Sequence, residues 1–315
     1  MGVFTISFNE YNISLDRREQ GSNLDFISHA HTDHITAAKK SQKVLSSVET
    51  AELIESAYGI SVNRFEPNEK GIKLLDSGHM FGSKQLYIED YENGKSIIYT
   101  GDFQMQESDI SKPIEIKQAD IAIIDSTYSN PKVRFPNRQE IIENIILWVT
   151  NKISNGIILF SAYRMGKAQE LIKIMNKAGI KPVVTKKISE VNKVYEKNGI
   201  SLAYSSAYNS DLESDGINDH NFVGITEDRN VRMLAEKLGS VYKRRVYTAV
   251  ATGFAEIFRF NTDVQFPLSD HADFYQILEY ISKVQPKKIY TYGKSKEFLA
   301  KSLAESGYDA LPSIY

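Results

Sequence analysis

The chain of 315 residues contains no cysteine, and this absence excludes two kinds of structure at once. It excludes disulfide bonds, and it excludes thiolate ligands for a metal ion. Any bound metal must therefore be held by histidine, aspartate or glutamate. That donor set suits hydrolytic chemistry with zinc, manganese or iron.

Long apolar stretches are also absent from the sequence. No uninterrupted run approaches the ~20 apolar residues that a membrane-spanning helix requires. The first residues do not show the basic start and apolar segment that are typical of a signal peptide. We therefore expect a cytoplasmic protein without membrane attachment, long enough for two domains or for one elaborated domain.

The chain has no strong excess of either charge, and its formal net charge is −2. Residues 138–265 contain 18 basic and 14 acidic side chains, whereas the rest of the chain contains 20 basic and 26 acidic ones. A mildly basic middle within an acidic remainder fits a separate anion-facing region. Surface lysines alone could produce the same distribution.

Histidine is scarce but strongly concentrated. Three of the six histidines fall in residues 28–34, Ser-His-Ala-His-Thr-Asp-His, directly after an apolar run. Residues i and i+2 of an extended segment point the same way, so His29 and His31 can bind one metal ion together. Asp33 and His34 follow on the turn and face the same cavity. The alternative is a polar surface loop, but half of all histidines in one short segment favours a metal site.

Other histidine and acidic residues stand where predicted strands end. His79 lies between two predicted strands, Asp102 follows the strand 96–100, and Asp125 follows the strand 120–124. Layered α/β enzymes place functional side chains at this edge of a sheet, in a shared crevice. We therefore expect these side chains to meet.

The pattern changes from about residue 138 to alternating helices and strands, which is typical of a parallel sheet. We therefore predict an α/β fold in which residues 138–265 form an inserted α/β domain. Residues 1–137 and 266–315 would together form one metal-binding domain. His271 lies at the start of a predicted helix in the last part, which suggests that the chain returns there to the same edge of the first domain.

Together with the histidine cluster, His79 and Asp102 supply enough nitrogen and oxygen ligands for two adjacent cations. A bridging carboxylate such as Asp102 can hold two ions ~3.5–4 Å apart, the spacing at which both the attacking and the leaving oxygen of a phosphodiester are stabilised. Taken singly, His79 could be an ordinary loop histidine and Asp102 a turn residue after Gly101.

These residues fall into motifs through which the chain resembles the metallo-β-lactamase superfamily. It is most similar to the nucleic-acid-processing β-CASP branch, and there to compact archaeal and bacterial proteins known as ligase-associated DNA exonucleases or mRNA 3′-end processing factor-like proteins. The resemblance implies an αββα sandwich with an inserted β-CASP domain. The motifs are H-x-H-x-D-H at 29–34, S-G-H at 77–79 with G-S at 82–83, Y-T-G-D at 99–102, D-S-T-Y at 125–128, A-Y-R-M-G-K-A-Q at 162–169 and S-D-H-A-D at 269–273.

The resemblance implies a site for one or two zinc ions, with manganese as an alternative. Three imidazoles would hold one ion, a carboxylate and an imidazole would hold the second, and one carboxylate would bridge them. The implied ligands are His29, His31 and His79 for the first ion, Asp33 and His34 for the second, and Asp102 as the bridge.

The resemblance also implies a catalytic pair, Asp125 with His271. A hydrogen bond to a carboxylate keeps an imidazole protonated more of the time, so His271 could stabilise the scissile phosphate or protonate the leaving oxygen. Asp33 would orient the attacking water, and Asp25 would orient the loop of ligands. The alternative for His271 is a helix-start histidine without a catalytic role.

One position departs from the family pattern. Many members complete the second metal site with a histidine where this chain has Tyr292, directly before Gly293. A neutral phenol is a poor zinc ligand, so the second ion should bind more weakly. DNA-repair members of the branch also lack this histidine, which favours DNA as the substrate. Tyr292 could stack on a base, bond to a phosphate or simply pack.

Four residues are candidates for binding substrate phosphate. Arg164 and Lys167 stand at the start of a predicted helix, where backbone N–H groups favour anions. Ser161 and Lys294 are expected near the same crevice, and either lysine could instead be an ordinary solvated side chain. His220, in a polar loop, is interpreted as a surface histidine.

The sequence thus predicts a zinc-dependent nuclease that hydrolyses phosphodiester bonds of single-stranded DNA or RNA, in DNA repair or RNA processing. A 5′ exonuclease is the leading interpretation. The alternatives are an RNA 3′-end processing endonuclease, a thioester or lactone hydrolase that uses the same metals, and a non-catalytic subunit. A DNA ligase or RNA-processing proteins are candidate partners, and the oligomeric state stays open.

Overall fold

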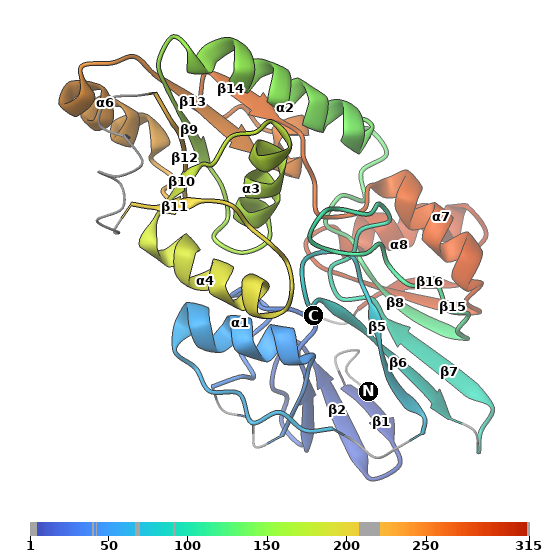
Figure 1. Ribbon diagram of the computed structural model, residues 1–315. Helices are drawn as coiled ribbons and strands as arrows, with labels where there is room; N and C mark the ends of the chain where they lie inside the picture. The colour runs from blue at the N-terminus through green and yellow to red at the C-terminus, as the bar shows by residue number, and fades with distance from the viewer. Residues whose placement is uncertain are drawn as a thin grey trace. The chain divides into compact units, whose positions relative to one another are not determined.

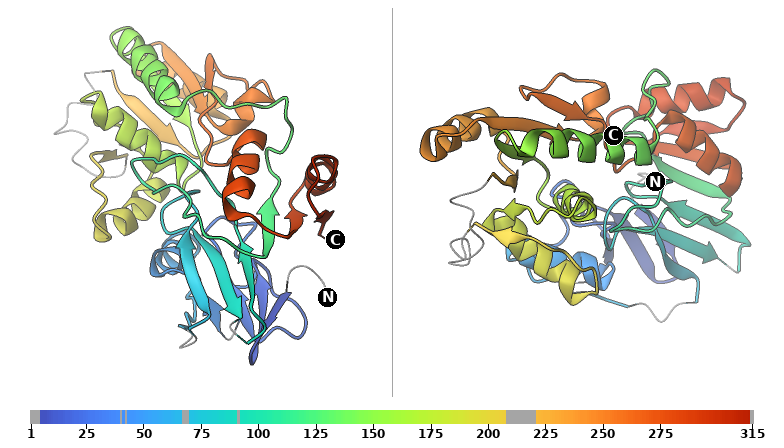
Figure 2. Two further views of the ribbon diagram at one scale, coloured as in Figure 1. Left: turned by 90° about the vertical axis from the view of Figure 1, so that its right-hand side faces the viewer. Right: turned by 45° about the horizontal axis from the view of Figure 1, so that its top comes forward.

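The computed structural model describes residues 5–39, 41, 43–66, 70–90, 92–207 and 221–313, so His220 lies outside the described residues. The chain divides into two compact units (Figure 1, Figure 2). Unit 1 comprises Met1–Arg134 and His271–Tyr315, and unit 2 comprises Phe135–Asp270. Both units combine helices with sheets, which confirms the predicted α/β class. Within the described ranges, no helix is long and apolar enough to span a membrane.

Unit 1 is built on two sheets, with the strand orders β1-β2-β3-β4 and β16-β15-β8-β7-β6-β5. The strands of the first sheet are β1 (Thr5–Phe8), β2 (Tyr11–Leu15), β3 (Leu24–Phe26) and β4 (Val44–Leu45). Those of the second sheet are β5 (Ile72–Asp76), β6 (Lys84–Asp90), β7 (Lys95–Tyr99), β8 (Ile121–Asp125), β15 (Lys288–Tyr292) and β16 (Ala310–Pro312). The helices are α1 (Val48–Tyr58), α7 (Phe274–Val284) and α8 (Lys296–Glu305).

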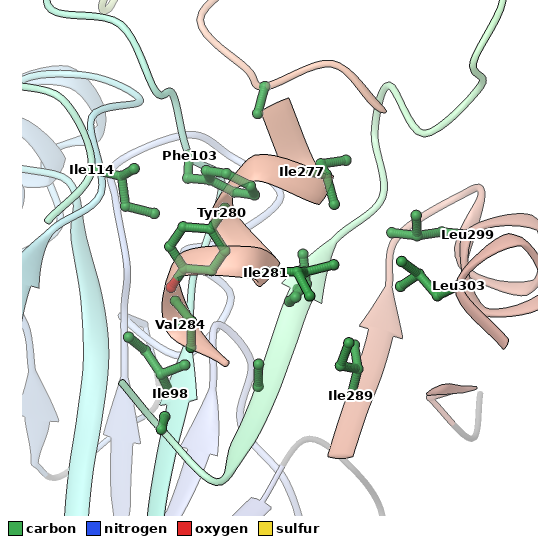
Figure 3. Packing of buried hydrophobic residues seen from close by; sticks show 14 of the residues in the cluster. Ile98, Phe103, Ile114, Ile277, Tyr280, Ile281, Val284, Ile289, Leu299 and Leu303 are labelled. Carbon is green, nitrogen blue, oxygen red and sulfur yellow. The ribbon is translucent and has the colours of Figure 1, made fainter. Parts of the chain in front are cut away.

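The six-stranded sheet of unit 1 is buried on both faces. Side chains alternate between the two faces of a strand. On one face, Tyr99 and Ile123 pack against the four-stranded sheet. On the other face, Ile98 packs with Tyr280 on the side of α7 and α8 (Figure 3). Burial of an isoleucine on either side contributes ~1.5–3 kcal/mol. The carboxyl ends of these strands therefore form a well-supported edge for the side chains that follow them.

Unit 2 is built on one parallel sheet with the order β11-β10-β12-β9-β13-β14. Its strands are β9 (Ile157–Ser161), β10 (Val183–Val184), β11 (Ser205–Ser206), β12 (Val223–Thr226), β13 (Val246–Ala251) and β14 (Val264–Phe266). Its helices are α2 (Arg138–Ile153), α3 (Lys167–Lys177), α4 (Lys186–Lys197) and α6 (Val231–Tyr242), with the 3-10 helix η1 (Gly253–Glu256). The parallel sheet predicted from the alternating pattern is thus present, and its strand β9 is apolar and buried from Ile157 to Phe160, as a sheet covered on both faces requires.

Candidate metal centre

The candidate ligands of unit 1 lie where its strands end. His29 and His31 follow β3, His79 lies between β5 and β6, and Asp102 follows β7. Among the described residues, three groups of histidine and aspartate could hold a metal ion, and in each group the ligand atoms lie within 4.8 Å of one another. All members of these groups belong to unit 1. Strand pairing therefore assembles ligands that are far apart in the sequence.

Three imidazoles form the first group. The Nδ1 atom of His31 lies 3.2 Å from Nε2 of His29 and 3.1 Å from Nε2 of His79. A tetrahedral zinc ion bound to nitrogen at ~2.0–2.1 Å would separate its ligand nitrogens by ~3.3 Å. The spacing and the donor type both fit one zinc ion.

Asp102 lies at the centre of the wider set. Its Oδ2 atom is 3.4 Å from Nε2 of His34, 3.7 Å from Nε2 of His29, and 3.9 Å from Nε2 of both His79 and His271. One carboxylate oxygen therefore faces four imidazoles, as a carboxylate between two ions would. Burial raises the pKa of Asp102 to about 6, although His34 partly counteracts this effect.

His29 is held in the form that binds metals. Its side chain is fully buried, and burial lowers its pKa well below 6.5, with further lowering from His34 and His79. The Nδ1 atom of His29 lies 2.9 Å from Oγ of Ser28. The Ser28 hydroxyl donates its own hydrogen to the Asp16 carboxylate, so it accepts a hydrogen bond from His29 Nδ1–H. The lone pair on Nε2 of the neutral ring then points into the site.

Asp16, which the sequence analysis missed, organises this part of the site. Its Oδ1 accepts from the Ser28 backbone N–H at 2.6 Å. Its Oδ2 accepts from Ser28 Oγ at 2.7 Å, from the Tyr99 hydroxyl at 2.7 Å and from His34 Nδ1 at 2.8 Å. It thus orients His34 directly and His29 through Ser28, which is how the neighbours of metal ligands fix ring orientation and tautomer.

The two carboxylates beside His34 also decide its charge. Burial alone would lower the pKa of His34, but Asp102 and Asp16 outweigh this effect and raise the pKa to about 10. In the metal-free protein the His34 ring therefore carries a proton near neutral pH. A metal ion at Nε2 would have to displace that proton.

Asp25 does not have the contacts that the sequence analysis expected. Its carboxylate accepts from Ser14 Oγ and, at 2.8 Å, from Ser22 Oγ. The reason lies in the strand register. Ser14 pairs with Asp25 within the sheet, so the Asp25 carboxylate stays beside β2. Asp16 stands just beyond the Leu15–Phe26 pair, where the loop that carries the ligands begins. The orienting contact therefore comes from Asp16. Asp16 directly follows an apolar strand, and this pattern alone is enough to make an acidic residue a candidate for the site.

Asp33 lies at the exposed rim of the site. Its side chain is 79% exposed, and its Oδ2 lies 3.7 Å from Nε2 of His34. It belongs to none of the three groups of close ligand atoms among the described residues. Its predicted roles, as a ligand and as the group that orients water, therefore stay predictions.

The structure brings Asp125 and His271 together. His271 Nδ1 lies 3.2 Å from Asp125 Oδ2, and the other oxygen of Asp125 accepts from Thr127 N–H at 3.0 Å and from Thr127 Oγ1 at 2.7 Å. The carboxylate is thus held from one side while it holds the imidazole on the other. The His271 ring lies 4.5 Å from the His79 ring, centroid to centroid, so the pair directly borders the candidate metal ligands.

Tyr292 is buried in the core of unit 1. Its ring lies 5.0 Å from that of Tyr99, and it packs in the cluster between the two sheets. Burial raises the pKa of Tyr292 well above its ordinary value, and the neighbouring Tyr99 adds to the effect. The phenol is therefore neutral. Of the three roles predicted for Tyr292, which are stacking on a base, bonding to a phosphate and packing, its surroundings favour packing.

The candidate phosphate contacts are divided between the units. Lys294 is an exposed residue of unit 1, whereas Ser161, Arg164 and Lys167 belong to unit 2. Ser161 Oγ donates to the Asp228 carbonyl at 2.9 Å. Lys167 is 1% exposed, and its ammonium group is bonded to two carboxylates. The phosphate contact at Lys167 stays a prediction, and the burial and pairing of the ammonium group make Lys167 the weakest of the four candidates.

Comparison with models of known protein families finds no match. Among curated proteins, the chain is similar to a probable DNA ligase of Opitutus terrae, with 30% identity over 303 residues that cover 90% of this chain and 28% of that protein. It is 30% identical to an RNase J-like protein of Methanocaldococcus jannaschii over 49% of this chain and 36% of that protein. It is 23% identical to DNA cross-link repair 1A protein of Homo sapiens over 56% of this chain and 18% of that protein. The chain thus spans well under half the length of these relatives.

The chain therefore belongs to the metallo-β-lactamase superfamily and, within it, to the β-CASP branch. A crystal structure of a protein of unknown function from Enterococcus faecalis V583 has a similar fold, with a TM-score of 0.57 and 15% identity, over 85% of this chain and 74% of that chain.

Proposed function

We propose that the chain is a zinc-dependent nuclease that degrades single-stranded DNA or RNA as a 5′ exonuclease. Residues 1–137 and 266–315 would form the αββα metallo-β-lactamase domain, and residues 138–265 the inserted β-CASP domain. The main support is the convergence of four imidazoles on the Asp102 carboxylate. The relatives named for RNase J and for DNA cross-link repair support nucleic acid as the substrate class.

The donor set fits zinc without any thiolate. The proposed ligands are His29, His31 and His79 for one ion, His34 and Asp33 for a second, and Asp102 between them. When bound, zinc would act as a Lewis acid on the scissile phosphate and lower the pKa of a water molecule. Because Asp33 is largely exposed and Tyr292 offers no nitrogen, we expect the second ion to be held more weakly than the first.

The remaining steps belong to the protein's own acids and bases. Asp33, at the rim, would orient the attacking water. His271 would donate a proton from Nε2 to the leaving oxygen, while Asp125 accepts the hydrogen bond from Nδ1 and stabilises the charged ring. Arg164, Ser161 and Lys294 are candidates for binding the phosphate groups of the strand, and Lys167, whose ammonium group is paired with two carboxylates, is a weaker one.

End-labelled strands test this proposal. We expect purified protein with zinc or manganese to degrade single-stranded DNA or RNA from the 5′ end, and the variant His31→Ala to be inactive. The matched control is His220→Ala, which removes the one histidine outside the motifs. No cleavage of either polymer at full metal occupancy would refute the proposal, and cuts within a strand would favour the RNA 3′-end processing endonuclease.

The chemically different alternative is a thioester or lactone hydrolase with the same metals. A generic thioester assayed beside bis-p-nitrophenyl phosphate separates the two reaction types. The Asp125–His271 pair favours the phosphodiester over the thioester, since an alkoxide that leaves phosphorus needs a proton and a thiolate does not. Turnover of the thioester alone would support the alternative, and a metal-free protein without activity would support a non-catalytic subunit.

We also propose a DNA ligase as a functional partner. The relative from Opitutus terrae named as a probable DNA ligase contains a region similar to 90% of this chain. Regions joined in one protein often act together when they are separate. Sedimentation of the chain with a DNA ligase of the same organism tests the partnership, and a lack of any complex, with or without nicked DNA, would contradict it.

A further inference from the structure

A ring of four charged side chains lies in unit 2, outside the candidate metal centre. Arg138 is the first residue of α2, Lys167 and Glu170 lie in the first turn of α3, and Asp270 is the last residue of unit 2. Lys167 Nζ donates to Glu170 Oε2 at 2.6 Å and to Asp270 Oδ1. Arg138 Nη2 donates to Glu170 Oε1, and Arg138 Nη1 donates to the Ser269 carbonyl at 2.8 Å.

The ring is buried and its charges alternate. The side chains of Lys167 and Glu170 are 2% and 3% exposed, and those of Arg138 and Asp270 are 11% and 13% exposed. Two positive and two negative groups make the ring neutral. Removing such charges from water is costly, so buried ion pairs add little net stability compared with apolar side chains of the same size. What they do provide is a fixed geometry, because each partner has to be in place.

The contacts of the ring start and end on neighbouring residues of one segment. They begin at the Ser269 carbonyl, pass through Arg138, Glu170 and Lys167, and end at the Asp270 carboxylate. The backbone and the side chain of this segment are therefore both held. The next residue in the chain is His271.

The segment after this point is held as well. The His271 carbonyl accepts from Gln104 Nε2 at 2.9 Å, and Ala272 N–H donates to the Phe103 carbonyl at 2.7 Å. Asp273 then starts α7 with a capping box, in which its side chain accepts from Gln276 N–H and the Gln276 side chain accepts from Asp273 N–H. His271 thus stands where a segment held within unit 2 ends and a segment held within unit 1 begins.

We propose that Lys167, with Arg138 and Glu170, is a positioning residue for the reaction of the metal centre. The ring fixes the backbone one peptide bond before His271, and so restricts the conformations of the backbone that carries the imidazole. This inference rests on the proposed function, in which His271 protonates the leaving oxygen. It gives Lys167 a role other than the phosphate contact predicted from its place at a helix start.

Leaving-group dependence tests this role, because only a poor leaving group needs a proton from His271. The alkoxide of a DNA or RNA strand needs one, whereas p-nitrophenolate leaves bis-p-nitrophenyl phosphate without one. We expect His271→Ala to slow strand cleavage by ~10²–10⁴-fold. We expect Lys167→Met to lower kcat on the strand by ~10–100-fold with little change in KM. Both variants should retain most of their activity on the nitrophenyl ester.

Three further variants sharpen the comparison. Lys167→Arg keeps the positive charge and should recover most of the lost rate. Lys177→Met removes an exposed lysine at the end of the same helix and serves as the matched control. In the His271→Ala background, Lys167→Met should cause no further loss on the strand, since the residue that it positions is already gone.

Equal losses on both substrates, or additive losses with His271→Ala, would overturn the inference. If Lys167→Met does not fold, Asp270→Asn keeps the size of the side chain, weakens the same ring and should show the same selective loss. A readout without turnover is the imidazole ¹⁵N NMR spectrum, in which the His271 signals should shift in Lys167→Met and stay in place in Lys177→Met. Unchanged His271 signals refute the positioning role, whereas a wild-type protein inactive on both polymers refutes only the proposed function.

Discussion

The variant Asp16→Asn tests how the metal centre is organised. Asp16 Oδ2 accepts from His34 Nδ1, Ser28 Oγ and the Tyr99 hydroxyl, while Oδ1 accepts from Ser28 N–H. An asparagine has one acceptor atom and one donor group in place of two acceptors. It therefore cannot satisfy both sides, whichever way the amide is turned.

The consequence for the metal follows from the imidazole tautomer. If the amide oxygen faces Ser28 N–H, the NH₂ group faces His34 Nδ1, which must then become an acceptor. The ring hydrogen of neutral His34 moves to Nε2, the nitrogen that faces Asp102, and that nitrogen can no longer bind a metal ion. We expect the affinity for the ion at His34 to fall ~10–100-fold, which corresponds to ~1.4–2.7 kcal/mol.

Competition with a chromophoric chelator measures the affinity. Asp25→Asn is the matched control, because Asp25 is also a buried carboxylate of the same sheet but bonds to Ser14 and Ser22. It should lower the melting temperature and leave metal affinity unchanged. Equal metal affinity in wild type and Asp16→Asn, or an equal loss in both variants, would refute the assignment of the orienting role to Asp16.

Two further predictions concern the charge of His34 and the space around Gly101. In the metal-free protein the pKa of His34 is raised from 6.5 to about 10, so the folded state keeps a proton that the unfolded state loses. The free energy of unfolding should therefore fall between pH 6.5 and 10, by at most ~1.4 kcal/mol per pH unit. Denaturant titrations with a chelator present measure the slope, and an unchanged slope in His34→Gln would contradict the assignment. Gly101 has a φ of +55°, and a Cβ there would lie 2.7 Å from Ser28 Cβ. Alanine at Gly101 should cost the ~1–2 kcal/mol of a left-handed residue and a further ~1–3 kcal/mol from overpacking, and it should weaken metal binding. Alanine at Gly94, which has a φ of +60° and no atom within 4 Å, should cost only the ~1–2 kcal/mol of a left-handed residue and leave metal binding intact. Thermal unfolding and metal titration check both, and equal effects at the two glycines would contradict this explanation.

Local patterns were sufficient to predict much of the site. The spacing of His29 and His31 is a property of one extended segment, and Asp102 and Asp125 each follow an apolar strand. Each of these patterns involves only a few neighbouring residues. They were sufficient because the segments that contain them all end at the same edge of the sheet. The α/β class follows from the same patterns and is confirmed by the two units.

Long-range pairing could not be predicted in the same way. The position of Asp16 directly after an apolar strand makes it a candidate, but the register of β2 against β3 is needed to see that Asp25 pairs with Ser14 and does not reach the ligand loop. Lys167 is bonded to Asp270, a residue 103 positions further along the chain. Nothing in the local sequence distinguishes it from a solvated lysine at a helix start.

The contact between Arg138 and Ser269 has a consequence for how the chain is assembled. It joins a residue near the start of unit 2 to one near its end at 2.8 Å, so the two ends of this unit meet. In unit 1, Tyr128 and Asp273 form a parallel β-bridge, so the two cut ends of that unit are neighbours as well. A segment whose ends meet can be gained or lost between two neighbouring residues at little cost in loop closure. Among the described residues every group of close ligand atoms belongs to unit 1, so the insertion of unit 2 between two neighbouring points of that unit does not interrupt the set of ligands.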